Sequence, residues 1–137
     1  NNHIQNENGY NSIHKENVNV FNLIIKEYDP KIIITSAWRY MILGEAMTLK
    51  GFEYMLLTYG INCENMIIGY TEKDDDTFLQ DGLALRVKQI KNKINELNIT
   101  KYLVLDDLPL KINNFYKTDP TTGLIMKDLE GIKKCLE

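Results

Sequence analysis

The spacing of apolar residues along the chain predicts four helices. Residues 15–28 carry apolar side chains at near-helical spacing, and this helix should end before Pro30, because the residue preceding a proline avoids the helical conformation. Residues 44–59 predict a second helix, with Gly60 as its C-terminal cap. Residues 83–97 show the clearest amphipathic stripe, and a last helix is predicted close to the C-terminus.

Three short apolar segments alternate with these helices. Residues 31–35 have the β-branched composition typical of a strand buried on both faces, and residues 66–70 and 101–105 predict two further strands. Strands that alternate with helices of ten or more residues pair in parallel. The predicted fold is therefore α/β, a three-layer sandwich with a parallel, Rossmann-like sheet, and residues 1–137 are expected to form one domain.

Polar residues follow two of the predicted strands. Thr35 and Ser36 come directly after the first strand, and Asp106 and Asp107 after the third. Because ligands of an open parallel sheet bind at the carboxyl ends of its strands, we expect these groups to converge. Two adjacent carboxylates repel one another, which indicates a cation beside them, and their hard oxygens suit Mg²⁺ bound together with a substrate phosphate. Arg86, near the start of a predicted helix, would supply positive charge for that phosphate.

These residues also fit structural roles, because Asp, Ser and Thr commonly start turns or cap helices and a helical arginine is most often solvated. Trp38 is expected to pack in the core, and Arg39 also fits an ion pair with a surface carboxylate. The acidic run at residues 74–76 is typical of a solvated loop. His3 and His14 lie in polar stretches without partners in sequence and are assigned no catalytic role.

Composition and net charge limit which classes of partner the protein is expected to bind. Of the 137 residues, 44% are hydrophobic and 26% charged, which is ordinary for a globular domain. The net charge of −3 argues against an extended surface for duplex nucleic acid, and no apolar run is long enough to cross a membrane. The first residues have no signal-peptide pattern, and Cys63 and Cys135 have no metal-ligand spacing, so a reduced, cytoplasmic setting is expected.

Four segments together resemble a branch of the haloacid dehalogenase (HAD) superfamily that includes domains of RNA-repair proteins. Residues 32–39 (IIITSAWR) are similar to its strand followed by Ser/Thr-Ser-x-Trp-Arg, and residues 102–107 (YLVLDD) to its metal-binding strand. Residues 86–90 (RVKQI) are similar to its Arg-x-x-Glu-Ile helix start, with Gln89 in place of the glutamate. Residues 118–124 (TDPTTGL) resemble its Thr-Asp-x-x-x-Gly-Leu loop.

The resemblance implies a role for each group. Thr35 would bind the phosphate through its hydroxyl, supported by the backbone of Ser36, and Arg39 would contribute to substrate binding. Arg86 would neutralise the phosphoryl group and the nucleophile, so Thr35 and Arg86 are the catalytic residues expected within this sequence. A small cap at most fits between the motifs, which implies an open site. The Mg²⁺ ligands, directly or through water, would be Asp106 and Asp107.

The first motif of the superfamily has no counterpart in the sequence. That motif is a strand ending in Asp-x-Asp, whose first aspartate attacks phosphorus and whose second acts as general acid and base. The sequence starts at Asn1, where the family would already be leaving this strand. Because the other motifs are intact, we expect the nucleophile strand upstream of Asn1, and residues 1–137 alone are expected to lack it.

The function implied by the resemblance is Mg²⁺-dependent hydrolysis of a phosphomonoester through an aspartyl-phosphate intermediate. A nucleic-acid end, a nucleotide and a small phosphorylated metabolite are all candidate substrates. Two other interpretations stay open, namely an inactive module that binds phosphate or metal to regulate a partner, and a phospho-accepting receiver domain. The receiver fits least well, because receivers place their acidic pair on the first strand.

Overall fold

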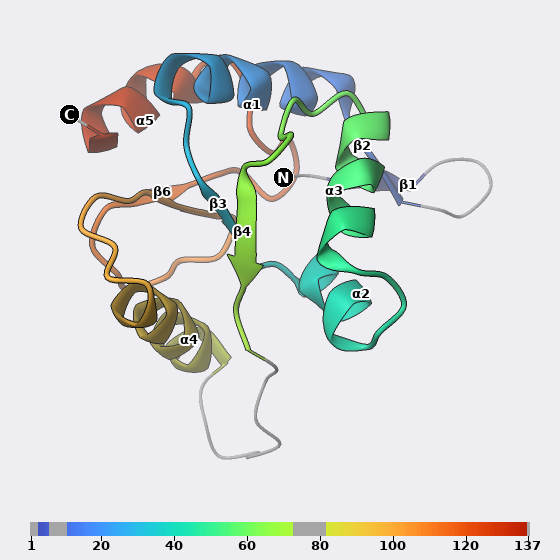
Figure 1. Cartoon of the computed structure of the whole chain (residues 1–137). Coiled ribbons are helices and arrows are strands. Elements are labelled where there is room, and N and C mark those ends of the chain that lie inside the picture. The colour runs from blue at the N-terminus through green and yellow to red at the C-terminus, as the bar shows by residue number, and fades with distance from the viewer. Residues whose placement is uncertain (1–2, 6–10, 73–81, 137) are drawn as a thin grey trace.

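The structure is a computed structural model that describes residues 3–5, 11–72 and 82–136. Helices and short strands alternate along these residues, which confirms the α/β class (Figure 1). In chain order the elements are β1 (His3–Gln5), β2 (Asn11–Ile13), α1 (Lys15–Tyr28), β3 (Ile32–Ile34), the 3-10 helix η1 (Ala37–Arg39), α2 (Tyr40–Leu43), α3 (Leu49–Thr58), β4 (Ile67–Tyr70), α4 (Gly82–Glu96), β5 (Val104–Asp106), β6 (Phe115–Lys117) and α5 (Asp128–Leu136).

The strands associate in pairs. β3 pairs in parallel with β4, with Ile34 opposite Tyr70, and β5 pairs in parallel with β6, with Asp106 opposite Lys117. β1 and β2 form an antiparallel pair. The parallel pairing expected from the sequence is confirmed, in the form of small two-stranded sheets within the described part of the chain.

Helix α1 joins two parts of the hydrophobic core. Its Val18 and Ile25 belong to a cluster with Phe52 of α3, whereas its Val20 and Ile24 belong to a cluster with Ile132 of α5. α1 and α5 consequently lie side by side, and α4 lies on the other side of the strands (Figure 1). A third cluster packs α4 against β5. None of the described helices is both long and apolar enough to span a membrane.

The helix predicted over residues 44–59 begins differently from the prediction. α2 ends at Leu43, and α3 begins only at Leu49, where the Thr48 hydroxyl accepts a hydrogen bond from the Gly51 N–H at 3.0 Å. This side-chain cap starts α3, so the predicted helix begins later than expected, and the short α2 before it was not predicted. Gly60 follows α3 with a φ of +94°, the left-handed conformation expected of a C-terminal glycine.

Two strand predictions also differ from the structure. The third predicted strand, residues 101–105, is observed as Val104–Asp106. It starts later than predicted because its partner β6 begins only at Phe115, and the ladder starts where the Val104 N–H donates to the Asn114 carbonyl. β6 itself was not predicted. At the N-terminus, the antiparallel pair of β1 and β2 was not predicted. The acidic run at residues 74–76 lies outside the described residues.

One polar contact joins the start of the fold to its end. Asn17 is buried in the first turn of α1, and its Nδ2 donates to the carbonyls of Thr122 at 2.9 Å and Leu124 at 2.7 Å. Between them, Gly123 adopts a φ of +70°, which a residue with a side chain rarely adopts. The loop after β6 is therefore fixed against α1.

Candidate functional site

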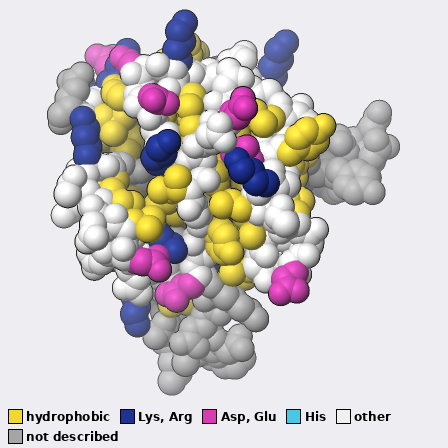
Figure 2. All heavy atoms as spheres, viewed as in Figure 1, with side chains coloured by type: hydrophobic (Ala, Val, Ile, Leu, Met, Phe, Trp, Pro, Cys, Tyr) yellow, Lys and Arg dark blue, Asp and Glu magenta, His cyan; other side chains and the backbone are white. Residues whose placement is uncertain are grey.

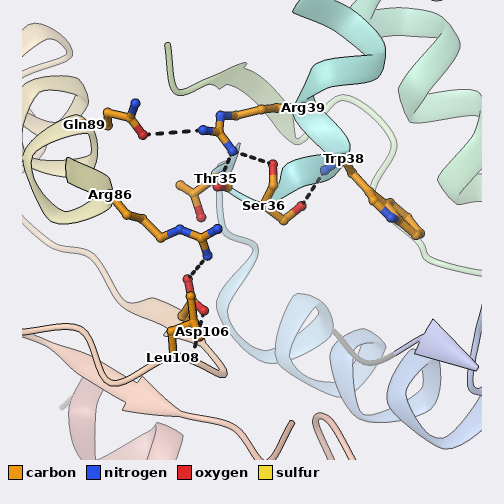
Figure 3. A network of polar contacts seen from close by, with 8 residues as sticks. All are labelled: Thr35, Ser36, Trp38, Arg39, Arg86, Gln89, Asp106 and Leu108. Carbon is orange, nitrogen blue, oxygen red and sulfur yellow. Dashed lines mark hydrogen bonds and ion pairs between the residues drawn. The ribbon is translucent and has the colours of Figure 1, made fainter. Parts of the chain in front are cut away.

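An ion pair marks the site at the carboxyl end of β5. Arg86 of α4 places Nη1 2.7 Å from Oδ2 of Asp106, the last residue of β5 (Figure 3). The Asp106 side chain is only 6% exposed and that of Arg86 is 25% exposed. The other carboxylate oxygen of Asp106 accepts the Leu108 N–H at 3.0 Å. Asp106 and Arg86, 20 residues apart in the sequence, are thus in direct contact, and both were predicted site residues.

Thr35 and Ser36 form the turn that leaves β3. The parallel ladder continues beyond β3, since the Thr71 N–H donates to the Ile34 carbonyl at 3.0 Å. The Ser36 carbonyl then accepts the Arg39 N–H at 3.0 Å, which closes the turn into η1. Figure 3 shows the Thr35 side chain directed toward the Arg86 guanidinium. The structure therefore brings Thr35, Arg86 and Asp106 to one region, as expected for carboxyl ends of parallel strands.

Arg39 lies inside the protein, with 1% of its surface exposed. Its Nη1 donates to the carbonyls of Thr35 at 3.0 Å and Ser36 at 2.9 Å, and its Nε lies 3.4 Å from the carbonyl of Glu72. Its Nη2 lies 3.4 Å from Oε1 of Gln89, which is also buried. These contacts give Arg39 a structural function beneath the site, and direct contact between Arg39 and a substrate stays a prediction.

Asp107 completes the pair of carboxylates expected to hold a metal. It is half-buried, and within the described residues its carboxylate forms no hydrogen bond or ion pair. No group of three or more His, Cys, Asp or Glu side chains suited to a metal occurs in the part of the chain that the structure describes. Mg²⁺ commonly takes one or two carboxylates and completes its shell with water and phosphate oxygens. The donor set of Asp106 and Asp107 therefore fits Mg²⁺.

The loop after β6 borders the same region. The Thr118 N–H donates to the Asp106 carbonyl at 2.9 Å, which holds this loop against the end of β5. Asp119 follows, and the N–H groups of Thr121 and Thr122 donate to its Oδ1 at 2.7 and 3.2 Å. These two hydrogen bonds lower the pKa of the exposed Asp119 carboxyl below its ordinary value. Asp119 thus shapes the loop rather than joining the described ion pair.

Two residues near the site were not predicted as site residues from the sequence. Thr71, 1% exposed directly after β4, finds no hydrogen-bond partner for its hydroxyl among the residues that the structure describes. Gln89 is buried against Arg39, although the sequence showed only that it replaces a glutamate. For Thr71 the signal was available, because it follows an apolar strand as Thr35 does. For Gln89 the available signal was its spacing of three from Arg86, which puts both on one helix face.

The remaining candidates have structural positions. Trp38 packs edge-on against Phe52, with ring centroids 6.2 Å apart, in the core position expected for it. His14 caps α1, since its Nδ1 accepts the Glu16 N–H at 3.3 Å. On the face shown in Figure 2, basic and acidic side chains are interspersed with apolar ones.

Fold and site together define an α/β domain that gathers hydroxyl, guanidinium and carboxylate groups at the carboxyl ends of parallel strands. Residues 1–129 match the family model described as the HAD domain in Swiss Army Knife RNA repair proteins, and the chain belongs to that family. The resemblance seen in the sequence is thereby confirmed, and the family supports a phosphohydrolase type of function. Neither a curated protein nor a solved structure matches the chain.

Proposed function

We propose that this domain is the larger part of a Mg²⁺-dependent phosphatase that hydrolyses a phosphomonoester, with a nucleic-acid end as the leading substrate. The observation that carries the proposal is the Arg86–Asp106 ion pair beside the Thr35 turn. In the proposal, the phosphate and its metal would meet at this cation and carboxylate. The family description adds RNA repair as the setting, and the free Cys63 and Cys135 support a reduced, cytoplasmic compartment.

Each residue has a distinct task in this reaction. The Thr35 hydroxyl and the backbone of Ser36 bind phosphate oxygens, and Arg86 stabilises the negative charge that develops on the phosphoryl group. Asp106 and Asp107 would hold Mg²⁺, which supplies further stabilisation of that charge when bound. An aspartate carboxylate attacks phosphorus, the bond to the leaving alcohol breaks, and water then hydrolyses the aspartyl-phosphate.

The attacking aspartate is proposed to come from a strand that precedes Asn1. Within the described residues β3 pairs only with β4, and β5 only with β6, so each has an edge available to a further strand. Unpaired strand edges are usually covered in soluble proteins, and a strand carrying the nucleophile would cover one beside Thr35 or Asp106.

The test compares a protein extended upstream through its preceding residues with residues 1–137 alone. We expect the extended protein to hydrolyse para-nitrophenyl phosphate with Mg²⁺, and residues 1–137 to show no hydrolysis. In the extended protein, Arg86→Ala should lower the single-turnover rate at least roughly tenfold, because one lost electrostatic contact in the transition state commonly costs several kcal/mol. Arg86→Lys should recover part of the rate, since it keeps the charge without the planar fork.

Lys88→Ala is the matched control, because Lys88 is exposed on the same helix and its charge equals that of Arg86. It should leave the rate unchanged. Equal hydrolysis by both lengths of protein would exclude an upstream nucleophile. Binding of inorganic phosphate without any hydrolysis by the extended protein would instead support the regulatory binding module.

A further inference from the structure

The turn after β3 is held from beneath by one side chain. The Arg39 guanidinium donates to two successive carbonyls, those of Thr35 and Ser36, at 3.0 and 2.9 Å. A guanidinium is planar and rigid, so two bonds from one nitrogen fix the orientation of both peptide groups. The direction of the Thr35 side chain follows from that of its backbone. Arg39 therefore restrains the backbone from which the Thr35 side chain projects.

The same guanidinium reaches the helix that carries Arg86. Its Nη2 lies 3.4 Å from Oε1 of Gln89, and Gln89 follows Arg86 by three residues on the same face of α4. This contact is longer than the two carbonyl contacts, so it is the weaker end of the connection. Figure 3 shows the resulting sequence of contacts from the Thr35 turn through Arg39 to α4, whose Arg86 in turn meets Asp106.

The burial of Arg39 and Gln89 restricts the geometry of this contact. Arg39 is 1% and Gln89 3% exposed. A buried charge is costly unless it is hydrogen-bonded, so its position is restricted to sites where its acceptors converge. An apolar side chain of similar volume would fill the space between η1 and α4 but would offer no donor to the Thr35 and Ser36 carbonyls or to Gln89. The polar contact therefore specifies geometry in addition to filling space.

We infer that Arg39 and Gln89 are positioning residues that set the placement of Thr35 relative to Arg86. For its ligand this inference rests on the proposed function, in which those two residues grip one phosphate. Arg39 holds the turn that carries the Thr35 hydroxyl, and Gln89 holds α4, which carries Arg86. Neither residue needs to touch the phosphate.

Gln89→Leu tests the inference, since it removes the acceptor and keeps a side chain of similar size. Asn92→Leu is the matched control, an amide-to-leucine change at an exposed position of the same helix. In the ligand-free protein, NMR should show solvent exchange of the Arg86 Nε–H at least about threefold faster in Gln89→Leu. Calorimetry on the upstream-extended protein with Mg²⁺ should show inorganic phosphate bound about tenfold more weakly, the size of a typical coupling between sites.

Gln89→Glu keeps an acceptor at the same place and should restore both quantities, whereas Asn92→Leu should change neither. If Gln89→Leu fails to fold, Gln89→Asn, which withdraws the amide by one methylene, replaces it. Unchanged Arg86 exchange and unchanged phosphate affinity in a folded Gln89 variant would overturn the inference. Faster Arg86 exchange in a protein whose wild type binds no phosphate would support the positioning role and contradict the proposed function.

Discussion

The two parallel strand pairs differ in the charge that their carboxyl ends surround, which is a cation at one end and carboxylates at the other. At the end of β3 and β4, backbone carbonyls surround the cation of Arg39, and they come from segments more than 30 residues apart. At the end of β5 and β6, the carboxylates of Asp106 and Asp119 accept N–H groups from residues only two or three positions later. The first end gathers acceptors from distant segments around one cation, whereas the second surrounds its carboxylates with N–H groups from nearby turns, to which Arg86 and Asn17 add distant contacts. Substitutions should therefore have different effects at the two ends.

The two strand pairs also differ in how much space surrounds a glycine that lies in or beside them. A Cβ on Gly131 of α5 would lie 2.5 Å from Tyr116 Cε2, whereas a Cβ on Gly69 of β4 would meet nothing within 4 Å. Gly131→Ala should reduce the free energy of unfolding by about 1–3 kcal/mol, as overpacking does. Gly69→Ala should leave it unchanged or raise it by about 0.5 kcal/mol, since alanine is favoured over glycine inside a strand. Urea unfolding of both variants measures the difference, and equal effects would contradict the contrast.

The two neighbouring carboxylates should respond differently to neutralisation. Asp106→Asn breaks the ion pair with Arg86 and should cost about 1 kcal/mol of stability, because that pair is only partly shielded from water. Asp107→Asn breaks no contact among the described residues and should leave stability unchanged. Both variants should bind Mg²⁺ more weakly in a calorimetric titration, with thermal unfolding as the second measurement. If both variants bind Mg²⁺ as tightly as the wild type, the two carboxylates have only a structural role in the turn.

The smallest expected effect is a pH dependence confined to the β6 end. Burial and the hydrogen bond that the Tyr116 hydroxyl donates to Asp128 Oδ1 at 2.6 Å raise the pKa of Tyr116 from 10.0 to about 12. The folded state thus favours the neutral phenol, so this stabilisation is complete below pH 10 and is lost as the pH rises toward 12. Tyr116→Phe should flatten the decline in stability over that interval.

Tyr54→Phe is the control for this measurement, because Tyr54 is 70% exposed. The stability of the Tyr54→Phe variant should fall as the pH rises, as it does in the wild type. Chemical unfolding at several pH values between 9 and 12 compares the slopes, and an unchanged slope in Tyr116→Phe would assign the decline to other groups.

Elements with a long periodic pattern could be predicted from the sequence. α1 and α4 span 14 and 15 residues, which is enough for their apolar stripes to identify them. β6 could not be predicted, because three residues are too few to show alternation and its pairing depends on β5. The start of α3 was also predicted too early, since the apolar pattern extends upstream of the side-chain cap at Thr48.

The site shows the same division. Strand ends rich in Thr, Ser and Asp indicated correctly that Thr35 and Asp106 lie in one region with Arg86. That Asp106 and Arg86 form an ion pair with each other could not be deduced, because it depends on how α4 packs against β5. The burial of Arg39 was equally inaccessible, since its acceptors belong to three separate segments.

The contact of Asn17 with the loop after β6 has a consequence for synthesis on the ribosome. It joins positions 105 and 107 residues apart, and the neighbouring cluster joins Val20 and Ile24 to Ile132. The Val18 and Ile25 side of α1 can pack early against α3, but its Val20 and Ile24 side stays uncovered until the residues around Ile132 have emerged. Contacts so distant in sequence form slowly, and nascent chains with exposed apolar surface are prone to aggregate. The final closure of this part of the core therefore requires Leu124 and Ile132 to have been synthesised, and a nascent chain halted before Leu124 should engage chaperones through α1.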